Sequence, residues 1–356
     1  MFLLSPVFGD EISAVSFDKE LPENNIVTIQ PDSLRILHNP LTGWVLYASM
    51  GVDAADFWAQ YDHMYIPELG HNVSVTDYAH TLYIRASWTD FNPQEDVYGW
   101  KIDSNLRAYI EGAYQRNMRL AFRVVVDSRD KRTEFTPQFV KDAGAKGFMN
   151  KGKWSPYSDD SVFQKYYTKF VKALAKDFND PSKVEFIDGF GLGKWGEYHT
   201  MIYSTGDDTP KKAVFDWVTD IYSQAFDKVP VVINYHRWIG AGKDWVDDEH
   251  FAADSEEMLE EAIKKGYSLR HDAFGMTTYY GSWERRFAKK YRNICPIIME
   301  GGWIVKSHSY WQDPRGYRKD SHEDVRRGEF DDSKEAHVNM MDFRFGDTAV
   351  SYTHLT

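Results

Sequence analysis

Short apolar runs alternate along this chain with longer amphipathic stretches. The clearest amphipathic stretch, Ser161–Phe178, carries apolar residues at four-residue spacing, which is typical of a helix with one buried face. Seven apolar runs predict strands, and they begin near Gly43, Thr81, Arg119, Val184, Pro230, Ser268 and Pro296. Strand and helix signals in alternation indicate a parallel sheet with crossover helices. Eight such units would form a (β/α)8 barrel, the predicted fold.

The remaining stretches predict two more helices, the eighth strand and one long loop. Residues 254–266 open with acidic residues and end in Lys-Lys-Gly, which predicts a second capped helix. Residues 333–345 are predicted to form the helix after the seventh strand, and the eighth strand would fall near Thr348. Residues 127–156 are polar and rich in Gly and Lys, so we expect an enlarged loop after the third strand.

The two ends of the chain predict the domain boundaries. Residues 1–38 are expected to form an N-terminal segment with an extra strand over 24–38, and residues 39–350 the catalytic barrel. Residues 351–356 resemble the translation of a sequencing adapter, so they are predicted to be a non-native tail. The natural chain would then depart from this sequence after about Val350, leaving the barrel truncated at or near strand 8 and lacking a further β-rich domain.

Composition narrows the class of protein. Of the 356 residues, 42% are hydrophobic and 27% are charged, which suits one large folded domain. The net charge of −12 argues against a nucleic-acid partner, because phosphate binding needs basic clusters. Cys295 is the one cysteine, so it cannot form a disulfide within the chain. The 12 Trp and 22 Tyr fit either a large aromatic core or a cleft that binds sugars.

The sequence also bears on location. The first nine residues are apolar but lack the basic start of a signal peptide, and they match the clipped remnant of one. We therefore expect the protein to be periplasmic or extracellular, and a cytoplasmic location is the alternative. No run of 18 or more apolar residues occurs, so no membrane span is expected. The oligomeric state is left open.

Glu197 and Glu300 are the candidate catalytic residues. Each stands at the end of an apolar run, and 103 residues separate them. If one strand–helix unit takes roughly 30–35 residues, they belong to strands 4 and 7, at the face where barrels display their chemistry. Cleavage of a glycosidic bond needs two carboxyl groups, one to protonate the leaving oxygen and one to attack the anomeric carbon or activate water.

Other polar and aromatic residues are predicted around this pair. Arg85, ending strand 2, is expected to keep Glu300 ionised, and Arg123 on strand 3 to act similarly; structural ion pairs are the alternative for both. His199 would orient Glu197. Candidates for binding sugar hydroxyls end strands 5 and 6, namely Asn234, Tyr235, His236, Arg270, His271 and Asp272, with a structural role as the alternative for the two histidines. Candidate sugar platforms are Trp88, Trp195 and Trp303, with core packing as the alternative for each.

An ordered set of motifs carries a family resemblance. The set comprises Asn39-Pro-Leu-Thr-Gly-Trp44, the segment Tyr83-Ile-Arg-Ala-Ser-Trp88 with its continuation to Trp100, Trp195-Gly-Glu197-Tyr-His199, and Met299-Glu300-Gly-Gly. Over about residues 39–345 the chain resembles barrel glycoside hydrolases of clan A. The closest likeness is to bacterial proteins similar to family-42-type β-galactosidases that carry a C-terminal domain of unknown function.

This resemblance implies a hydrolase of carbohydrate metabolism. It implies a glycosidase that retains anomeric configuration and needs no cofactor, with Glu197 as acid/base and Glu300 as nucleophile. The substrate would be a carbohydrate, in bacterial polysaccharide degradation. One position departs from the clan, because Gly196 precedes Glu197 where the clan usually has an Asn that binds the sugar 2-hydroxyl. That contact is left unassigned.

Other chemistries find less support in the sequence. Metal-dependent hydrolase barrels begin with a His-x-His pair on strand 1, which here reads Trp44-Val-Leu-Tyr47, so no metal site is predicted. Glycines 189, 191 and 193 lack the spacing of a phosphate loop, and no G-x-S-x-G elbow occurs. The competing hypothesis is a non-catalytic barrel that binds glycans. The two hypotheses differ in whether Glu197 and Glu300 converge. The sugar, its linkage and exo or endo action are left open.

Overall fold

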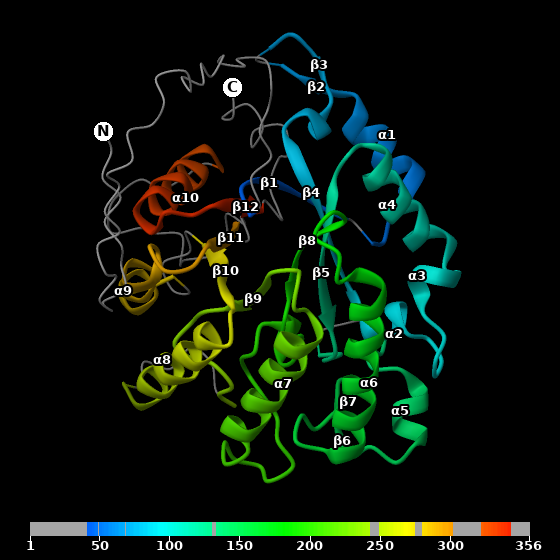
Figure 1. Cartoon of the computed structure of the whole chain (residues 1–356), viewed down its shortest axis with the longest axis vertical. Helices are drawn as coiled ribbons and strands as arrows, with labels where there is room; N and C mark the ends of the chain where they lie inside the picture. The colour runs from blue at the N-terminus through cyan, green and yellow to red at the C-terminus, as the bar shows by residue number, and fades with distance from the viewer. Residues whose placement is uncertain are drawn as a thin grey trace, which may run out of the picture. The chain divides into compact units, whose positions relative to one another are not determined.

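Eight parallel strands close into a barrel in the computed structural model (Figure 1). The structure describes residues 41–48, 50–67, 69–129, 133–242, 249–274, 280–301 and 322–342. In order round the barrel the strands are β1 (Gly43–Tyr47), β4 (Ala79–Ser87), β5 (Arg119–Val125), β8 (Val184–Asp188), β9 (Val231–Asn234), β10 (Ser268–Phe274), β11 (Ile297–Gly301) and β12 (Met340–Asp342). The predicted (β/α)8 barrel is confirmed. Glu197 follows its fourth strand, and Glu300 lies on its seventh.

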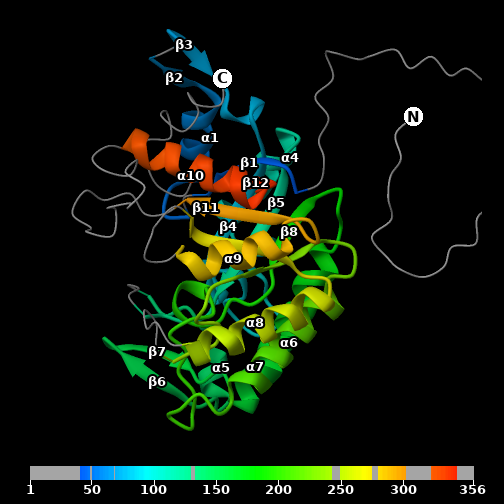
Figure 2. The ribbon, with the colours of Figure 1, turned by 90° about the vertical axis from the view of Figure 1, so that its left-hand side faces the viewer.

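Helices follow the strands and cover the outside of the barrel. They are α1 (Ala54–Asp62), α2 (Trp88–Phe91), α3 (Gly99–Ile102), α4 (Ser104–Gln115), α5 (Gln138–Asp142), α6 (Ser161–Phe178), α7 (Lys211–Ala225), α8 (Glu249–Lys264), α9 (Ser282–Tyr291) and α10 (His322–Ala336). Two short 3-10 helices, η1 (Val75–Asp77) and η2 (Lys194–Gly196), and a small hairpin of β2 (Met64–Ile66) and β3 (His71–Val73) complete this part. Figure 2 views the barrel from the side covered by α8, α9 and α10.

Helix α6 shows how the sequence builds these units. Its bounds are those that the apolar spacing predicts. Asp160 caps the first turn by accepting a hydrogen bond from the Phe163 amide at 2.9 Å, which satisfies one of the free amides there. The buried stripe of α6 includes Phe163, Phe170 and Leu174, and it packs on the outer face of the sheet.

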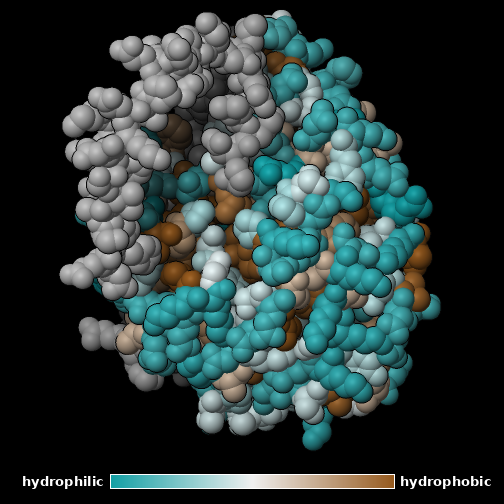
Figure 3. Space-filling view, in the orientation of Figure 1, coloured by the Kyte–Doolittle hydropathy of each residue, from teal (hydrophilic) through white to brown (hydrophobic). Residues whose placement is uncertain are grey.

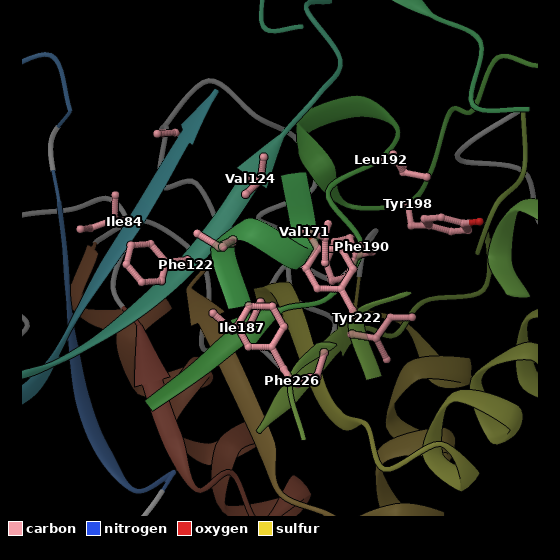
Figure 4. Packing of buried hydrophobic residues seen from close by; sticks show 14 of the residues in the cluster. Ile84, Phe122, Val124, Val171, Ile187, Phe190, Leu192, Tyr198, Tyr222 and Phe226 are labelled. Atoms are coloured by element: carbon pink, nitrogen blue, oxygen red, sulfur yellow. The ribbon is translucent and has the colours of Figure 1, made fainter. Parts of the chain in front are cut away.

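The main core lies between the sheet and the helices. Figure 4 shows Ile84 beside Phe122 on neighbouring strands, and Val171 of α6 and Tyr222 of α7 belong to the same cluster; all of these side chains are fully buried. Burial of each such side chain contributes roughly 1.5–3 kcal/mol. The face of the molecule in Figure 3 is mostly hydrophilic over the described helices, with hydrophobic residues visible between them.

A second, smaller apolar cluster fills the inside of the barrel. Its members face inward from the strands or precede them, and they are Leu41, Val45, Tyr83, Ala121, Phe186, Val232, Ile298 and Met340. Because side chains alternate across a strand, the residues two positions later face the same interior. These later residues lie at the carboxyl ends of the strands, where the sequence predicts the active site.

The eighth strand differs from the prediction. It is β12, which has three residues and pairs with both β1 and β11, so the predicted position near Thr348 is wrong. The helix predicted after the seventh strand is present as α10, but its predicted bounds of 333–345 are wrong, because α10 ends at Ala336 and His337 takes a left-handed φ of 53°. Asn339 then bonds to both backbone groups of Ile297, at 2.9 and 3.1 Å, and starts the strand. The three residues of β12 are too few to be recognised as a strand from the sequence alone.

The other expectations from the sequence are either corrected or left untested. Residues 127–156 are not one loop, because they contain α5 and a hairpin of β6 (Gly147–Asn150) and β7 (Lys153–Pro156). Helix α8 begins at Glu249, before the predicted start. The strand predicted over 24–38 and the tail at 351–356 lie outside the described residues, so those domain predictions and the truncation stay predictions. Within the described ranges, no helix is long and apolar enough to span a membrane.

Candidate active site

A polar layer lies directly above the apolar interior of the barrel. Two positions after Tyr83, Ala121, Phe186, Val232 and Ile298 come Arg85, Arg123, Asp188, Asn234 and Glu300. The register places Arg85 beside Arg123 on neighbouring strands and Arg270 beside Asn234. The strand period of two thus assembles three arginines and their acidic partners at the carboxyl end of the barrel.

Glu300 is held by one arginine. The Nη2 of Arg270 donates to the Oε2 of Glu300 at 2.5 Å, and the glutamate is only 1% exposed. A charge-assisted bond between two buried groups favours the ionised carboxylate. Arg270 is therefore the hydrogen-bonded partner of Glu300. Arg85, which the sequence predicts for this role, interacts electrostatically with both Glu197 and Glu300, so its part in keeping Glu300 ionised stays a prediction.

Glu197 has a looser set of contacts. Its Oε1 lies 3.6 Å from the Nη1 of Arg123 and 4.0 Å from the Nη2 of Arg85. Its Oε2 lies 3.4 Å from the Nε2 of His199, so the predicted contact between these two side chains is present. At 8% exposure, Glu197 is the more open of the two glutamates.

Arg123, Asp188 and Asp272 join the two glutamates in one network. Arg123 donates from Nε to Asp188 at 2.8 Å and from both terminal nitrogens to Asp272, at 2.6 and 3.1 Å. Arg270 donates from Nε to Asp272 at 2.8 Å. The Tyr83 hydroxyl also donates to Asp188. The path Glu197–Arg123–Asp272–Arg270–Glu300 is therefore continuous.

Asp272 has no acceptor capacity left for a sugar hydroxyl. Its Oδ1 accepts from Arg123 and Arg270, and its Oδ2 accepts from Arg123 and, at 3.2 Å, from Asn234. Four bonds fill the four lone-pair sites of a carboxylate. Burial alone would raise the pKa of Asp272, but the guanidiniums of Arg123 and Arg270 lower this pKa well below its usual range. Asp272 is thus bound to protein groups, contrary to the prediction that it binds sugar. The Asn234 amide has two N–H donors and uses one of them on Asp272, so its predicted contact with sugar stays a prediction.

The loop that carries Glu197 has an unusual backbone. Trp195, Tyr198 and Thr200 all have positive φ, at 60°, 60° and 51°, and so do the glycines at 193 and 196. Residues with side chains adopt this region at a cost of about 1–3 kcal/mol each. Such strain is typical of segments held for a function, and here it places Glu197 above the end of β8.

His236, two residues after β9, supports this loop. The Trp238 amide donates to its Nδ1 at 3.2 Å, so Nε2 carries the proton and donates to the backbone oxygen of Glu197 at 2.8 Å. Burial, followed by the nearby His199, lowers the pKa of His236 well below its ordinary value. The neutral ring therefore holds the Glu197 backbone in place instead of presenting a nitrogen to substrate.

Three predicted residues lie outside the barrel interior. Trp88 is fully buried among the rings of Phe139, Phe163, Tyr167 and Phe170. Tyr235 and His271 face outward and contact each other, with ring centroids 5.0 Å apart. Burial lowers the pKa of His271 to about 3. These residues pack the core behind the sheet. Trp88 begins helix α2, and strand alternation turns Tyr235 and His271 away from the residues that flank them.

The remaining candidates differ in exposure. The Arg85 Nη2 donates to the Trp195 carbonyl at 2.7 Å, which ties the second strand to the Glu197 loop. The half-buried Trp195 ring has the Lys194 ammonium 4.3 Å from its centroid. Trp303 lies outside the described residues.

Asp188 and Tyr83 are functional-site residues that the sequence analysis missed. Asp188 follows Phe186 by two positions, and Tyr83 precedes Arg85 by two. An acidic residue at an inward position of an otherwise apolar strand is the signal that could have found Asp188. Among the residues that the structure describes, no group of three or more His, Cys, Asp and Glu could hold a metal ion.

Comparisons with known proteins bear on the fold. No protein-family model and no curated protein matches the chain. The exo-β-1,4-mannosidase Op5Man5 from Opitutaceae bacterium strain TAV5 aligns with a TM-score of 0.52 at 12% identity, over 85% of this chain and 52% of its own. The endo-1,4-β-mannanase from Rhizomucor miehei aligns with a TM-score of 0.50 at 11% identity, over 87% of each chain. The structural neighbours are thus glycoside hydrolases, and at these identities the likeness defines the (β/α)8 fold.

Proposed function

We propose that this protein is a glycoside hydrolase that cleaves a glycosidic bond with retention of configuration. The observation that carries the proposal is that one buried network joins Glu197, in the loop after barrel strand 4, to Glu300, on barrel strand 7. Enzymes that retain configuration use two carboxyl groups that flank the scissile bond. The glycosidase neighbours of the fold support the same class of reaction.

In the first step, Glu300 attacks and Glu197 acts as the acid. The Glu300 carboxylate forms a bond to the anomeric carbon while the bond from that carbon to the leaving oxygen breaks. Glu197 transfers its proton to this oxygen, so the leaving group departs as a neutral alcohol. Arg270 keeps Glu300 ionised before the attack.

In the second step, water releases the sugar. Glu197, now a carboxylate, takes a proton from water as the oxygen of that water attacks the anomeric carbon. The bond from this carbon to Glu300 breaks, which restores the Glu300 carboxylate and the Glu197 acid. His199, at 3.4 Å, orients the carboxyl group of Glu197 in both steps.

Substrate contacts also belong to the proposal. The half-buried Trp195 beside Glu197 is the candidate platform for a sugar ring, since aromatic faces pack on the apolar faces of sugars. Arg85 borders the same space. The family-42-like relationship, a C-terminal domain in the natural protein and a role in bacterial polysaccharide degradation outside the cytoplasm are parts of the same hypothesis.

A screen of aryl glycosides tests the proposed function. The wild-type protein should release the aryl group from at least one glycoside, and Glu300→Gln should not. The Glu111→Gln variant removes the charge of an exposed glutamate on α4 and serves as the control with full activity. An active Glu300→Gln variant would refute the assignment.

A non-catalytic glycan-binding barrel is the second candidate. One observation in its favour is Gly196, which stands at the position where an Asn would bind the sugar 2-hydroxyl. The other is the hydrogen bond from Arg270, which already occupies one oxygen of Glu300. Calorimetry with mannose-containing and galactose-containing oligosaccharides would show binding without hydrolysis if this candidate is correct.

A further inference from the structure

Asp272 stands between the arginines that contact the two glutamates. The nitrogen of Arg123 that donates to Asp272 Oδ2 at 2.6 Å is the one that lies 3.6 Å from Glu197. On the other side, Arg270 donates from Nε to Asp272 Oδ1 at 2.8 Å and from Nη2 to Glu300 at 2.5 Å. Each glutamate is therefore one guanidinium away from the same carboxylate.

We propose that Asp272 is a positioning residue that couples the ionisation of Glu197 to that of Glu300 through Arg123 and Arg270. This inference rests on the proposed function and adds a residue that contacts neither reacting atom. The carboxylate offsets part of the charge of both guanidiniums. It thereby limits how strongly Arg123 favours the ionised form of Glu197, which must hold a proton before each turnover.

The charge of the whole layer supports this role. Arg85, Arg123 and Arg270 supply three positive charges, and Asp188, Asp272, Glu197 and Glu300 supply up to four negative charges. One proton among the four acids makes the layer neutral. Of the four acids, Glu197 makes the longest contacts to the arginines, so it is the least tightly paired of them.

Several other groups contribute to the field at Asp272. Asp188 bonds to Arg123 from β8 and lies 3.8 Å from the Arg270 Nε. Arg85 from β4 and the two nearby histidines, His236 and His271, interact electrostatically with Asp272. Asn234 from β9 donates to it but carries no charge. Of these groups, only Arg123 and Arg270 contact both Asp272 and a glutamate.

The Asp272→Asn variant tests the coupling. The amide keeps the size of the carboxylate but removes its charge, which leaves one more net positive charge next to both glutamates. The kcat/KM profile against pH, measured on the best aryl glycoside of the screen, should be bell-shaped in the wild type. Both limbs should move to lower pH in the variant, by about one unit or more.

Two further variants make the outcome decisive. Asp188→Asn removes a buried charge that hydrogen-bonds to Arg123 but lies 3.8 Å from the Arg270 Nε, so its acidic limb, which reports Glu300, should move less than in Asp272→Asn. Arg123→Lys keeps the positive charge but cannot bridge Asp188 and Asp272, so its basic limb should move to higher pH. If Asp272→Asn no longer unfolds cooperatively, the pH profile of Arg123→Lys serves as the test.

The possible failures can be told apart. Wild-type inactivity on every glycoside, or an active Glu300→Gln variant, overturns the proposed function and the coupling with it. An inactive Glu300→Gln variant together with unmoved limbs in Asp272→Asn and Arg123→Lys overturns the coupling alone. Movement of only one limb in Asp272→Asn also contradicts it, since the proposal requires both glutamates to respond.

Discussion

The two glutamates at the mouth of the barrel are held in opposite ways. Glu300 lies inside a regular strand, 1% exposed, with a guanidinium bond of 2.5 Å. Glu197 lies beyond its strand, in a loop with positive φ at neighbouring residues, and its nearest guanidinium nitrogen is 3.6 Å away. One carboxyl group is fixed and paired, while the other is less tightly paired and more exposed.

This difference between the two glutamates matches what a nucleophile and an acid/base each require. A nucleophile must stay ionised and aligned, and a short bond to a buried arginine provides both. An acid/base must gain and lose a proton in each cycle, which a tight ion pair would oppose. The geometry therefore favours Glu300 as nucleophile and Glu197 as acid/base. The predictions below test this contrast, from the largest expected effect to the smallest.

Replacing each glutamate should affect different substrates. Glu300→Gln should lower kcat/KM about 10⁴-fold or more on every glycoside, because the attacking group is lost. Glu197→Gln should lower it about 10²–10⁴-fold on glycosides with poor leaving groups and much less on dinitrophenyl glycosides, which need no protonation. Stopped assays over a series of leaving groups measure the difference. Equal losses over the whole series in both variants would contradict distinct roles.

Removing the partner of Glu300 should cost stability. Arg270→Met leaves Glu300 without its direct guanidinium partner and Asp272 with one fewer, and both carboxylates are buried. We therefore expect the free energy of unfolding to fall by about 3–5 kcal/mol. Arg107→Met is the control, because Arg107 forms an exposed pair with Glu111 and its loss should cost at most about 1 kcal/mol. Urea titration measures both. A loss in Arg270→Met no larger than in the control would show that this ion pair does not hold the site together.

The strained loop offers a matched pair of glycines. A Cβ at Gly193 (φ 74°) would meet the His199 carbonyl at 2.6 Å, while one at Gly206 (φ 78°) would meet nothing within 4 Å. Gly206→Ala should therefore cost only about 1–2 kcal/mol of backbone strain. Gly193→Ala should cost more and should also displace Glu197, with an activity loss of about 100-fold. Equal activity in the two variants would indicate that the loop geometry does not position Glu197.

His271 should affect only the pH dependence of stability. Its pKa falls to about 3 in the folded protein because burial disfavours the charged ring, against about 6.5 when unfolded. Between these values only the unfolded state binds the proton, so stability is lost as pH falls, at about 1.4 kcal/mol per pH unit. His271→Phe should reduce the slope of unfolding free energy against pH by that amount between about pH 6 and 3.5. An unchanged slope would show that His271 does not contribute.

The sequence predicts the fold and the strands that carry the glutamates because those signals are local. Apolar runs mark seven of the eight strands, and the carboxylates of Glu300 within β11 and Glu197 beyond β8 mark the active face. The sequence shows less clearly on which face of the sheet each side chain lies. Tyr235 and His271 are polar residues at strand ends, yet they point outward, because alternation places Asn234, Arg270 and Asp272 inside.

The partner of each group depends on the register between strands. Arg85 and Arg270 both end in guanidiniums, and nothing in the sequence distinguishes which one reaches Glu300. The pairing of β10 with β11 brings Arg270 to it. Likewise, β12 is too short to give a signal of its own, and its position depends on contacts of Asn339 with a strand more than forty residues earlier.

The central claim is that Glu300 is the nucleophile of a retaining hydrolase, and trapping the intermediate tests it most directly. The wild-type protein would be treated with the dinitrophenyl 2-deoxy-2-fluoro form of the glycoside that it hydrolyses best, digested, and analysed by mass spectrometry. We predict one added glycosyl group per chain, on the peptide that contains Glu300, and none in Glu300→Gln. A label on Glu197 or any other residue, or steady hydrolysis with inversion and no trapped adduct, would contradict it.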